Sequence, residues 1–236
     1  MPRFSVISIA KTEKELEHLR RSLANQTFRD FEFIVSTGGT IPEAWNNAIS
    51  KATGDFIVLI ESDAVPLSNK WLEEISRVAE KGVVYKGLEI NPTDLDLCNL
   101  VCDSSILKAE RFDVSFHICE DTELFARLRS KGVRIEQIND FPVIHAPSHT
   151  WEKTLSRSLI KGVYWAKIFY LHGRENVDDV NTRNFQRNRI NPVSERVRII
   201  TENALLLFGE FLGLFCCLPI LIRRRMNRKK DPAEML

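Results

Sequence analysis

Several features common in other classes of protein are scarce in this sequence, and each scarcity narrows the possible function. There are only five cysteines among 236 residues, and no two of them form a CxxC pair. A disulfide framework or a zinc ribbon is therefore not expected, and reduced thiols are the simplest interpretation. The formal net charge is only +1, so we expect no nucleic-acid partner. The first apolar run is too short for a signal peptide, and no internal repeat occurs.

What the sequence does contain is the composition of an ordinary folded protein, with 44% hydrophobic and 28% charged residues. Its length suits one sizeable α/β domain with additions. Short apolar runs alternate with helical patterns, which predicts a mostly parallel sheet flanked by helices on both faces. The expected strands are residues 4–9, 31–35, 56–60 and 83–88, and the expected helices begin at Thr12, Thr40 and Ser68.

The second half of the chain gives a mixed pattern. Residues 89–114 are expected to form short strands and loops that cross the front of the sheet. A helix over 120–131 stops at Gly132, and strands follow at 133–138 and 141–144. A long amphipathic helix is predicted over 150–171, followed by a polar stretch over 175–198.

The most informative stretch is the third strand and the acids that follow it. The apolar run 56–60 leads directly into Glu61, Ser62 and Asp63. In an α/β protein the carboxyl ends of the strands are where ligands bind. Two carboxylates placed there suit a divalent cation such as Mg²⁺ or Mn²⁺, and such a cation commonly carries phosphate oxygens. The sequence therefore predicts a metal–phosphate site here, with ordinary solvated acids as the alternative.

The C-terminal tail has an unusual composition. Residues 204–222 are almost continuously apolar, interrupted by Glu210 and Pro219, and six basic residues follow within 223–230. This length could span a bilayer, and the basic cluster suits anionic lipids on the cytoplasmic face. A single crossing would place the main domain outside the cell, so we favour a re-entrant or interfacial helix at the cytoplasmic face of the cell membrane. Burial against a partner subunit is the alternative.

Several segments in this order resemble the GT-A glycosyltransferases of family 2, which are inverting enzymes that use nucleotide-sugar donors. The resemblance covers roughly residues 3–145 and rests on a first strand, an "L..SL..Q.." helix end, an "..EiiV" strand, an "N.gi..A.Gd.i" segment, an acidic DxD-like motif and an "ED.el..rl...G" helix. These correspond here to residues 4–9, 19–28, 30–35, 46–57, 61–63 and 120–132.

The resemblance implies a GT-A fold, which is Rossmann-like with a central sheet flanked by helices. It also implies a metal-dependent, inverting transfer of a sugar from a nucleoside-diphosphate donor. We expect a catalytic domain over 1–149, a helix and polar linker over 150–200, and a hydrophobic membrane-associating segment over 201–236. Because residues 204–230 would hold the enzyme at a membrane surface, we expect a lipid-linked or surface-glycan acceptor.

The resemblance also implies roles for individual residues. Asp63 is expected to bind the metal, with His145 completing the site and His149 as a rival. Asp121 is expected to be the general base, with Glu120 beside it as the second catalytic candidate. One of the two can cap the helix while the other points at the acceptor, and the alternative is that both only cap it. The expected donor-binding residues are Ala10, Ser36, Gly38, Asn46, Glu61 and Ser62. We expect Glu61 to face away from Asp63 unless the loop turns, and to receive a ribose hydroxyl or a metal-bound water.

Two departures from the family pattern bear on this interpretation. The family usually shows "DDGS" after the second strand, whereas residues 36–39 here are Ser-Thr-Gly-Gly and carry no carboxylate. Glu61 also replaces the first Asp of DxD. The first departure favours an alternative, a catalytically inactive, membrane-tethered binding or scaffold protein. A sugar nucleotidyltransferase is another alternative, although residues 9–14 lack the Gly-rich first loop typical of that class.

Overall fold

The computed structural model describes residues 3–90, 98–145, 151–173, 175–177, 204, 207–209 and 211–213, with side chains of the long helix described from residue 159 onward. The chain divides into two compact units, Met1–Ser148 and His149–Leu236.

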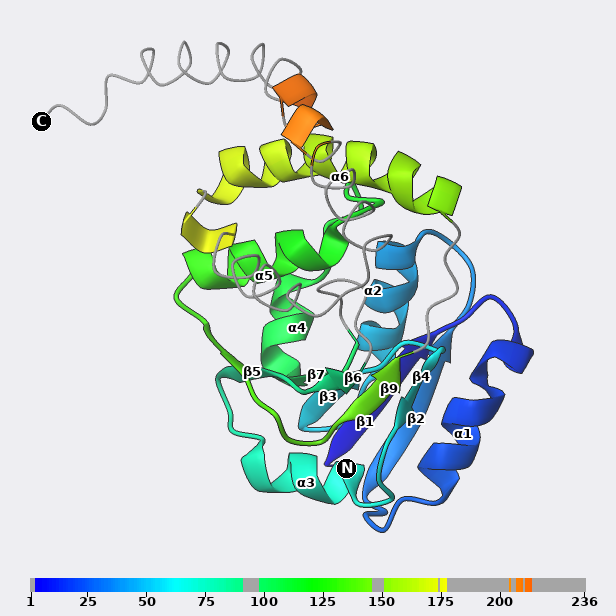
Figure 1. Ribbon diagram of the computed structural model, residues 1–236. Helices are drawn as coiled ribbons and strands as arrows, with labels where there is room; N and C mark the ends of the chain where they lie inside the picture. Colours follow the sequence, from blue (N-terminus) through cyan, green and yellow to red (C-terminus); the bar gives the residue numbers. More distant parts are fainter. Residues whose placement is uncertain are drawn as a thin grey trace, which may run out of the picture. The chain divides into compact units, whose positions relative to one another are not determined.

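The first unit is built on a six-stranded sheet with the order β2-β1-β3-β7-β5-β8 (Figure 1). Strands β2 and β3 run parallel to β1, and β8 runs parallel to β5, whereas β7 is antiparallel to both of its neighbours. The bounds are β1 Phe4–Ile9, β2 Phe31–Ser36, β3 Phe56–Leu59, β5 Val83–Lys86, β7 Leu100–Asp103 and β8 Arg134–Gln137.

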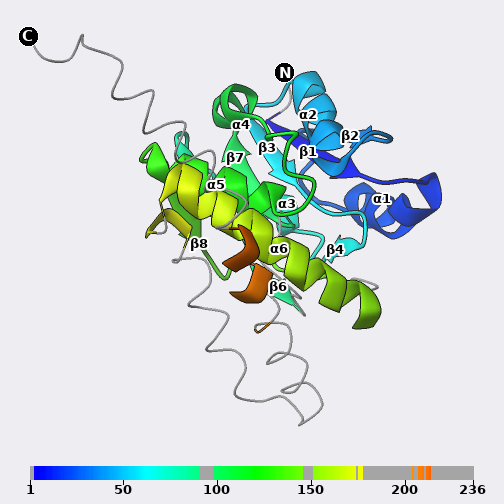
Figure 2. The same ribbon diagram turned by 90° about the horizontal axis from the view of Figure 1, so that it is seen from above.

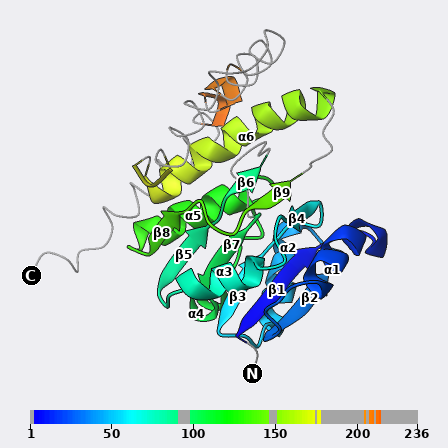
Figure 3. The ribbon, with the colours of Figure 1, turned by 60° about the horizontal axis from the view of Figure 1, so that its bottom comes forward.

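A second, three-stranded sheet has the order β4-β9-β6, and Figure 3 shows its strands side by side. Its strands are β4 Ala64–Pro66, β6 Glu89–Ile90 and β9 Val143–His145. The register pairs Ala64 with His145, so the segment that follows β3 is carried to the end of β9.

Helices cover both faces of the large sheet, and Figure 2 shows α1 on the opposite side from α2 and α4. One core contains apolar residues of α1 and α3, and the other contains those of α2, α4 and α5. The bounds are α1 Glu17–Ala24 (preceded by a 3₁₀ turn, Glu13–Leu16), α2 Ile41–Lys51, α3 Trp71–Val78, α4 Ser104–Glu110 and α5 Glu120–Ser130.

Strand β3 shows why this sequence gives two cores. Phe56 and Val58 pack in one core, whereas Ile57 and Leu59 pack in the other, because successive side chains of a strand point to opposite faces. Each such side chain contributes about 1.5–3 kcal/mol when it is fully buried. A strand that is apolar on both faces therefore has to lie between two layers of helices.

The fold confirms a central sheet that is mostly parallel, but it corrects the expectation for residues 89–114. The segment Leu100–Asp103 does not cross the front of the sheet; it is β7, a fully buried strand inside it. Four consecutive buried residues need hydrogen-bond partners on both sides, which β3 and β5 supply. Elsewhere the expected elements form, including α2, where Thr40 and Glu43 make a capping box and Pro42 lies in the first turn.

The described part of the second unit is helical. Helix α6, Trp151–His172, ends at Gly173, whose φ is +85°. Residues 207–209 and 211–213 are also helical and pack closely on α6: a Cβ at Gly213 would lie 2.7 Å from the Cβ of Ala166 and 2.9 Å from the Val163 carbonyl oxygen. Within the described residues, none of the helices combines the length and apolar character needed to cross a membrane. Most of the expected membrane segment and its basic cluster lies outside those residues.

Candidate metal and donor site

The carboxyl ends of β1, β2 and β3 meet at one edge of the large sheet. The Ala10 N–H donates to the Ser36 carbonyl oxygen over 3.3 Å, and the Ile60 N–H donates to the Ile7 carbonyl oxygen over 3.0 Å. Three of the predicted site residues, Ala10, Ser36 and Glu61, therefore lie at neighbouring strand ends. This is the edge at which ligands bind in open α/β sheets.

The acids that follow β3 lie against one histidine. His145 Nε2 is 2.9 Å from Glu61 Oε2 and 3.2 Å from Asp63 Oδ1. The Ala64 N–H donates to the Glu61 carbonyl oxygen over 3.1 Å and closes a turn. Both carboxylates therefore reach the same nitrogen, and the expectation that Glu61 faces away from Asp63 is wrong. Side chains two residues apart already share a face in an extended segment, and the turn keeps them together.

The three side chains form a donor set that fits a divalent cation. Their ligand atoms all lie within 4.8 Å of one another. A lone pair on Nε2 facing two carboxylates would be repelled, so a proton or a cation has to lie between them. His145 is 2% exposed, whereas the Glu61 and Asp63 side chains are 33% and 44% exposed, so the carboxylates border solvent. Carboxylate oxygens with one imidazole suit Mn²⁺, and Mg²⁺ also favours the oxygens.

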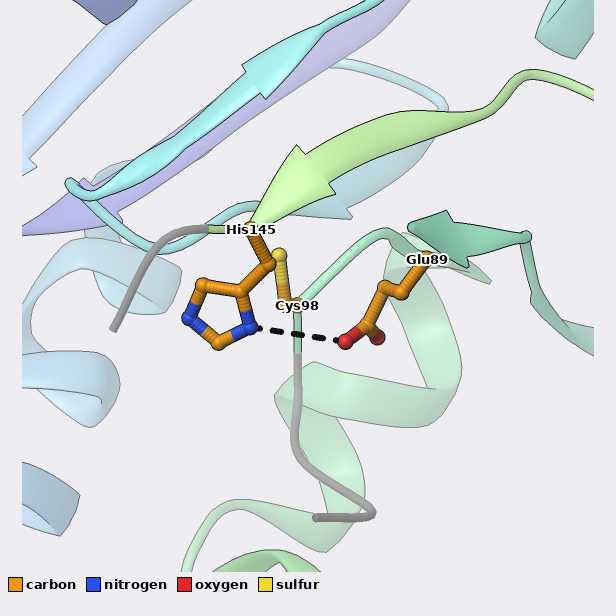
Figure 4. Close-up of side chains that lie close together, drawn as sticks. All are labelled: Glu89, Cys98 and His145. Atoms are coloured by element: carbon orange, nitrogen blue, oxygen red, sulfur yellow. Dashed lines mark ion pairs between the residues drawn. The ribbon is translucent and has the colours of Figure 1, made fainter. Parts of the chain in front are cut away.

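A second group of side chains lies on the other nitrogen of the same imidazole. Figure 4 shows Glu89 and Cys98 beside His145, with Glu89 Oε2 3.5 Å from His145 Nδ1. The ammonium group of Lys86 forms an ion pair with the other oxygen of Glu89 and donates to the Cys98 carbonyl oxygen. All four residues are buried. Sequence reasoning missed this group, because Lys86 and Glu89 lie on two separate short strands and resemble surface residues.

The loop after β2 supplies the predicted donor-binding glycine. Gly38 and Gly39 have φ values of +84° and +76°, a backbone conformation that strongly favours glycine. The Ser36 hydroxyl accepts a hydrogen bond from Asn47 Nδ2 over 3.3 Å. At the start of α2, hydrogen bonds from the backbone and the hydroxyl of Thr40 hold the pKa of Glu43 below its usual value, and nearby His117 adds to this shift. Glu43 is therefore a carboxylate beside a loop that has none of its own.

Asn46 was predicted to bind the donor, and the structure gives its side chain another partner. Its Nδ2 donates to the Phe112 carbonyl oxygen over 2.9 Å, and its Oδ1 accepts from the Phe112 N–H over 2.8 Å. This pair of bonds attaches α2 to the segment after α4. Ser62 lies in the turn between Glu61 and Asp63 and is partly buried. The donor-binding roles of both residues stay predictions.

The predicted base lies at the start of α5. Glu120 and Asp121 are the first two residues of that helix, and both are partly buried. Asp121 Oδ1 accepts a hydrogen bond from the Thr122 backbone over 2.6 Å. Among the described residues, neither acid belongs to the clusters that could hold a metal. Their catalytic roles stay predictions, and His149 lies outside the described residues.

No protein-family model matches the sequence, and a comparison with curated proteins gives no significant match. Solved structures do match. A mannosyltransferase, PcManGT from Pyrobaculum calidifontis in complex with GDP-Man and Mn²⁺, aligns with a TM-score of 0.60 at 13% identity over 98% of this chain and 81% of the other. TarS from S. aureus aligns with a TM-score of 0.50 at 16% identity over 88% of this chain.

The chain spans about half (49%) of that TarS chain, and 81% of TarS 1-349 in complex with UDP-GlcNAc. These likenesses show the fold, which is GT-A-like, as the sequence resemblance implies.

Proposed function

We propose that this protein is a metal-dependent, inverting glycosyltransferase of family 2 that moves a sugar from a nucleoside-diphosphate donor to an acceptor hydroxyl. The observation that carries the proposal is the set of Glu61, Asp63 and His145 at the ligand-binding edge of a GT-A-like fold. Similar folds occur in a mannosyltransferase complex with GDP-Man and Mn²⁺ and in TarS with UDP-GlcNAc. Because the carboxylates expected after β2 are missing, the nucleotide base of the donor is left unassigned.

In this proposal Asp63 and His145 hold Mn²⁺ or Mg²⁺, and Glu61 either shares the cation or accepts a hydrogen bond from its water. When bound, the cation neutralises charge on the leaving diphosphate. The backbone of Ala10 and the Ser36–Gly39 loop lie beside the donor. Asp121 takes the proton of the acceptor hydroxyl as that oxygen attacks the anomeric carbon, and the bond from that carbon to the diphosphate oxygen breaks. Binding both substrates in line supplies the rest of the acceleration.

Donor screening tests the reaction. The purified chain is incubated with UDP-, GDP-, dTDP- and CMP-linked sugars with Mn²⁺ or EDTA, and thermal shift and nucleotide release are measured. One donor is expected to raise the melting temperature only when Mn²⁺ is present, because a ligand that binds only the native state stabilises it. If a donor binds with Mn²⁺ but no nucleotide is ever released with any acceptor tested, the non-catalytic binding protein favoured by the acid-free loop at Ser36–Gly39 replaces the enzyme. If no donor binds, the proposal fails.

We also propose that the second unit holds the protein at an anionic membrane surface, where a lipid-linked or surface-glycan acceptor would lie. Leu207, Phe208 and Phe211 are each more than half exposed, on a segment whose opposite side carries the glycines that pack on α6. The basic residues at 223–230 follow in sequence and complement anionic head groups. Exposed aromatic and aliphatic side chains next to a basic cluster favour interfacial binding over association with another protein.

Vesicle sedimentation tests this second proposal. The full chain is expected to sediment with vesicles of anionic phospholipid and much less with neutral phosphatidylcholine. A Leu207→Ser/Phe208→Ser/Phe211→Ser variant is expected to lose most of that binding. The control is Leu67→Ser/Val114→Ser, which removes exposed apolar side chains from the first unit and should sediment like the wild type. Equal binding by the triple variant and the wild type would refute this contact.

A further inference from the structure

His145 lies between two groups of carboxylate side chains, one partly exposed and the other buried. Its Nε2 faces the partly exposed carboxylates of Glu61 and Asp63, and its Nδ1 faces the buried carboxylate of Glu89. The Glu89 side chain is 4% exposed, and the side chain of Lys86, its ion-pair partner, is 9% exposed. A carboxylate that is itself paired with a lysine therefore lies behind the imidazole, 3.5 Å from its Nδ1.

The strands explain why Glu89 can be fixed in this place. Strand β6 pairs in parallel with β9, and the register sets Glu89 opposite Val143 and Ile90 opposite Ile144, just before His145. Asn99 adds a tie between the two segments, because its Nδ2 donates to the carbonyl oxygens of Leu88, over 3.1 Å, and Phe141, over 2.8 Å. The positions of the carboxylate and the imidazole thus follow from backbone pairing.

We propose that Glu89 is a positioning residue for the metal centre: it holds the proton of His145 on Nδ1 and so directs the lone pair of Nε2 toward the cation. This inference rests on the proposed metal-dependent function. A carboxylate behind a metal-binding histidine fixes the orientation of the ring and makes the ligating nitrogen more basic. Lys86 holds the Glu89 carboxylate in place and satisfies its second oxygen.

The same observations argue against a second cation on the buried side. Glu89, Cys98 and His145 have ligand atoms close enough to hold a metal ion. The Lys86 ammonium group already pairs with Glu89 and donates to the Cys98 carbonyl oxygen, so its positive charge already balances the one carboxylate of this group. The buried group supports the site, and the cation binds on the solvent-facing side.

The test measures Mn²⁺ affinity directly, by the loss of the electron paramagnetic resonance signal of free Mn²⁺, so it does not depend on a known donor or acceptor. Glu89→Gln is expected to weaken Mn²⁺ binding by about 10- to 100-fold, the range for a partner behind a ligand. Because that variant leaves the buried Lys86 charge without its carboxylate, which destabilises the fold, the second variant is Lys86→Met/Glu89→Gln. It removes both charges, and the same loss of Mn²⁺ affinity is expected.

The matched control is Arg127→Met/Glu123→Gln. It removes another ion pair with a buried carboxylate from the same unit, with Arg127 Nε 2.8 Å from Glu123 Oε1, and neither residue is a member of the clusters around His145. Its Mn²⁺ affinity should equal that of the wild type. If the control loses as much affinity as Lys86→Met/Glu89→Gln, the effect is a general loss of structure and the positioning role is refuted.

Asp63→Ala separates this inference from the proposed function. If Asp63→Ala weakens Mn²⁺ binding and the Lys86→Met/Glu89→Gln variant binds like the wild type, the role of Glu89 is refuted and the metal site stands. If Asp63→Ala itself binds Mn²⁺ normally, the metal site is wrong and the role of Glu89 falls with it. A loss in both variants with none in the control supports the proposal.

Discussion

Carboxylates lie at both ends of the central strands, but they contact different groups at the two ends. At the amino end, one carboxylate, that of Glu32, accepts hydrogen bonds from Ser5 Oγ at 2.6 Å and from the backbone and hydroxyl of Thr53 at 2.6 and 2.8 Å. At the carboxyl end, two carboxylates face a single imidazole nitrogen and a third faces the other nitrogen. The acid at the amino end is bonded to protein donors, whereas the two acids at the carboxyl end converge on one imidazole nitrogen.

These surroundings distinguish a structural polar cluster from a candidate ligand site. A carboxylate surrounded by protein donors is satisfied and holds segments together. Two carboxylates that converge on one imidazole form a donor set of the kind that binds a divalent cation. Substitutions at one end at a time should therefore have different effects.

The largest effect is expected from the carboxyl end. Asp63→Ala should reduce sugar transfer to the level seen with EDTA, because removing a metal ligand costs the charge stabilisation of several kcal/mol that the cation supplies. Transfer is measured with the donor identified by screening. The control is Asp55→Ala, which removes an exposed acid just before the amino end of the same strand and should be active. Full activity of Asp63→Ala would refute the comparison.

Asp121→Asn is expected to give the next largest effect. It should lower kcat by about 10²–10⁴-fold, the usual contribution of a general base, and leave Mn²⁺ and donor binding unchanged. The amide keeps the size of the carboxylate and can still accept the hydrogen bond from Thr122. Steady-state kinetics and donor titration are measured on the same preparation. Normal turnover would show that another residue takes the proton.

Glu32→Gln alters the amino end of the strands. It should lower the free energy of unfolding by about 1–3 kcal/mol, because the charged acceptor of several hydrogen bonds is lost. At about 2–4 °C per kcal/mol for a domain of this size, the melting temperature should fall by several degrees. Mn²⁺ affinity should not change. A variant with normal stability and weakened Mn²⁺ binding would contradict the division between structural and ligand-binding ends.

The smallest effect expected is in the pH dependence of stability. Burial raises the pKa of Glu32, but hydrogen bonds from Ser5, Thr53 and Gly54 outweigh it, so the pKa lies below its ordinary value of 4.5. The stabilisation from Glu32 is thus fully present above pH 4.5 and is lost as the pH falls through the lowered pKa. Thermal denaturation between pH 6 and pH 3 should show a steeper loss in the wild type than in Glu32→Gln. Equal slopes would assign the acid sensitivity to other carboxylates.

The sequence predicted the frame of the fold and one side of the candidate site. Buried strands with two apolar faces and capped helices have strong local patterns, as in β3 and α2. Glu61 and Asp63 were predictable because they follow such a strand. The buried strand β7 was missed because its four residues, LVCD, are too short to show a period and they pair with strands distant in sequence.

The buried side of the site could not be predicted for a related reason. Glu89 and Lys86 are charged residues, which are almost always exposed unless they are paired, and nothing local shows that each is the other's partner behind His145. Their relation depends on the pairing of β6 with β9 across the chain. The position of Asp121 at a helix start was predictable, but its distance from the acceptor depends on the acceptor.

The antiparallel register that sets Ala64 beside His145 has a consequence for assembly. Glu61 and Asp63 follow β3, early in the chain, whereas His145 ends β9, the last strand of the first unit. A cation held by all three would therefore act as a cross-link between early and late segments. Mn²⁺ should then slow amide hydrogen exchange in β4 and β9 together, well beyond the residues that touch it, and a chain cut short before β9 should neither bind the ion nor gain that protection.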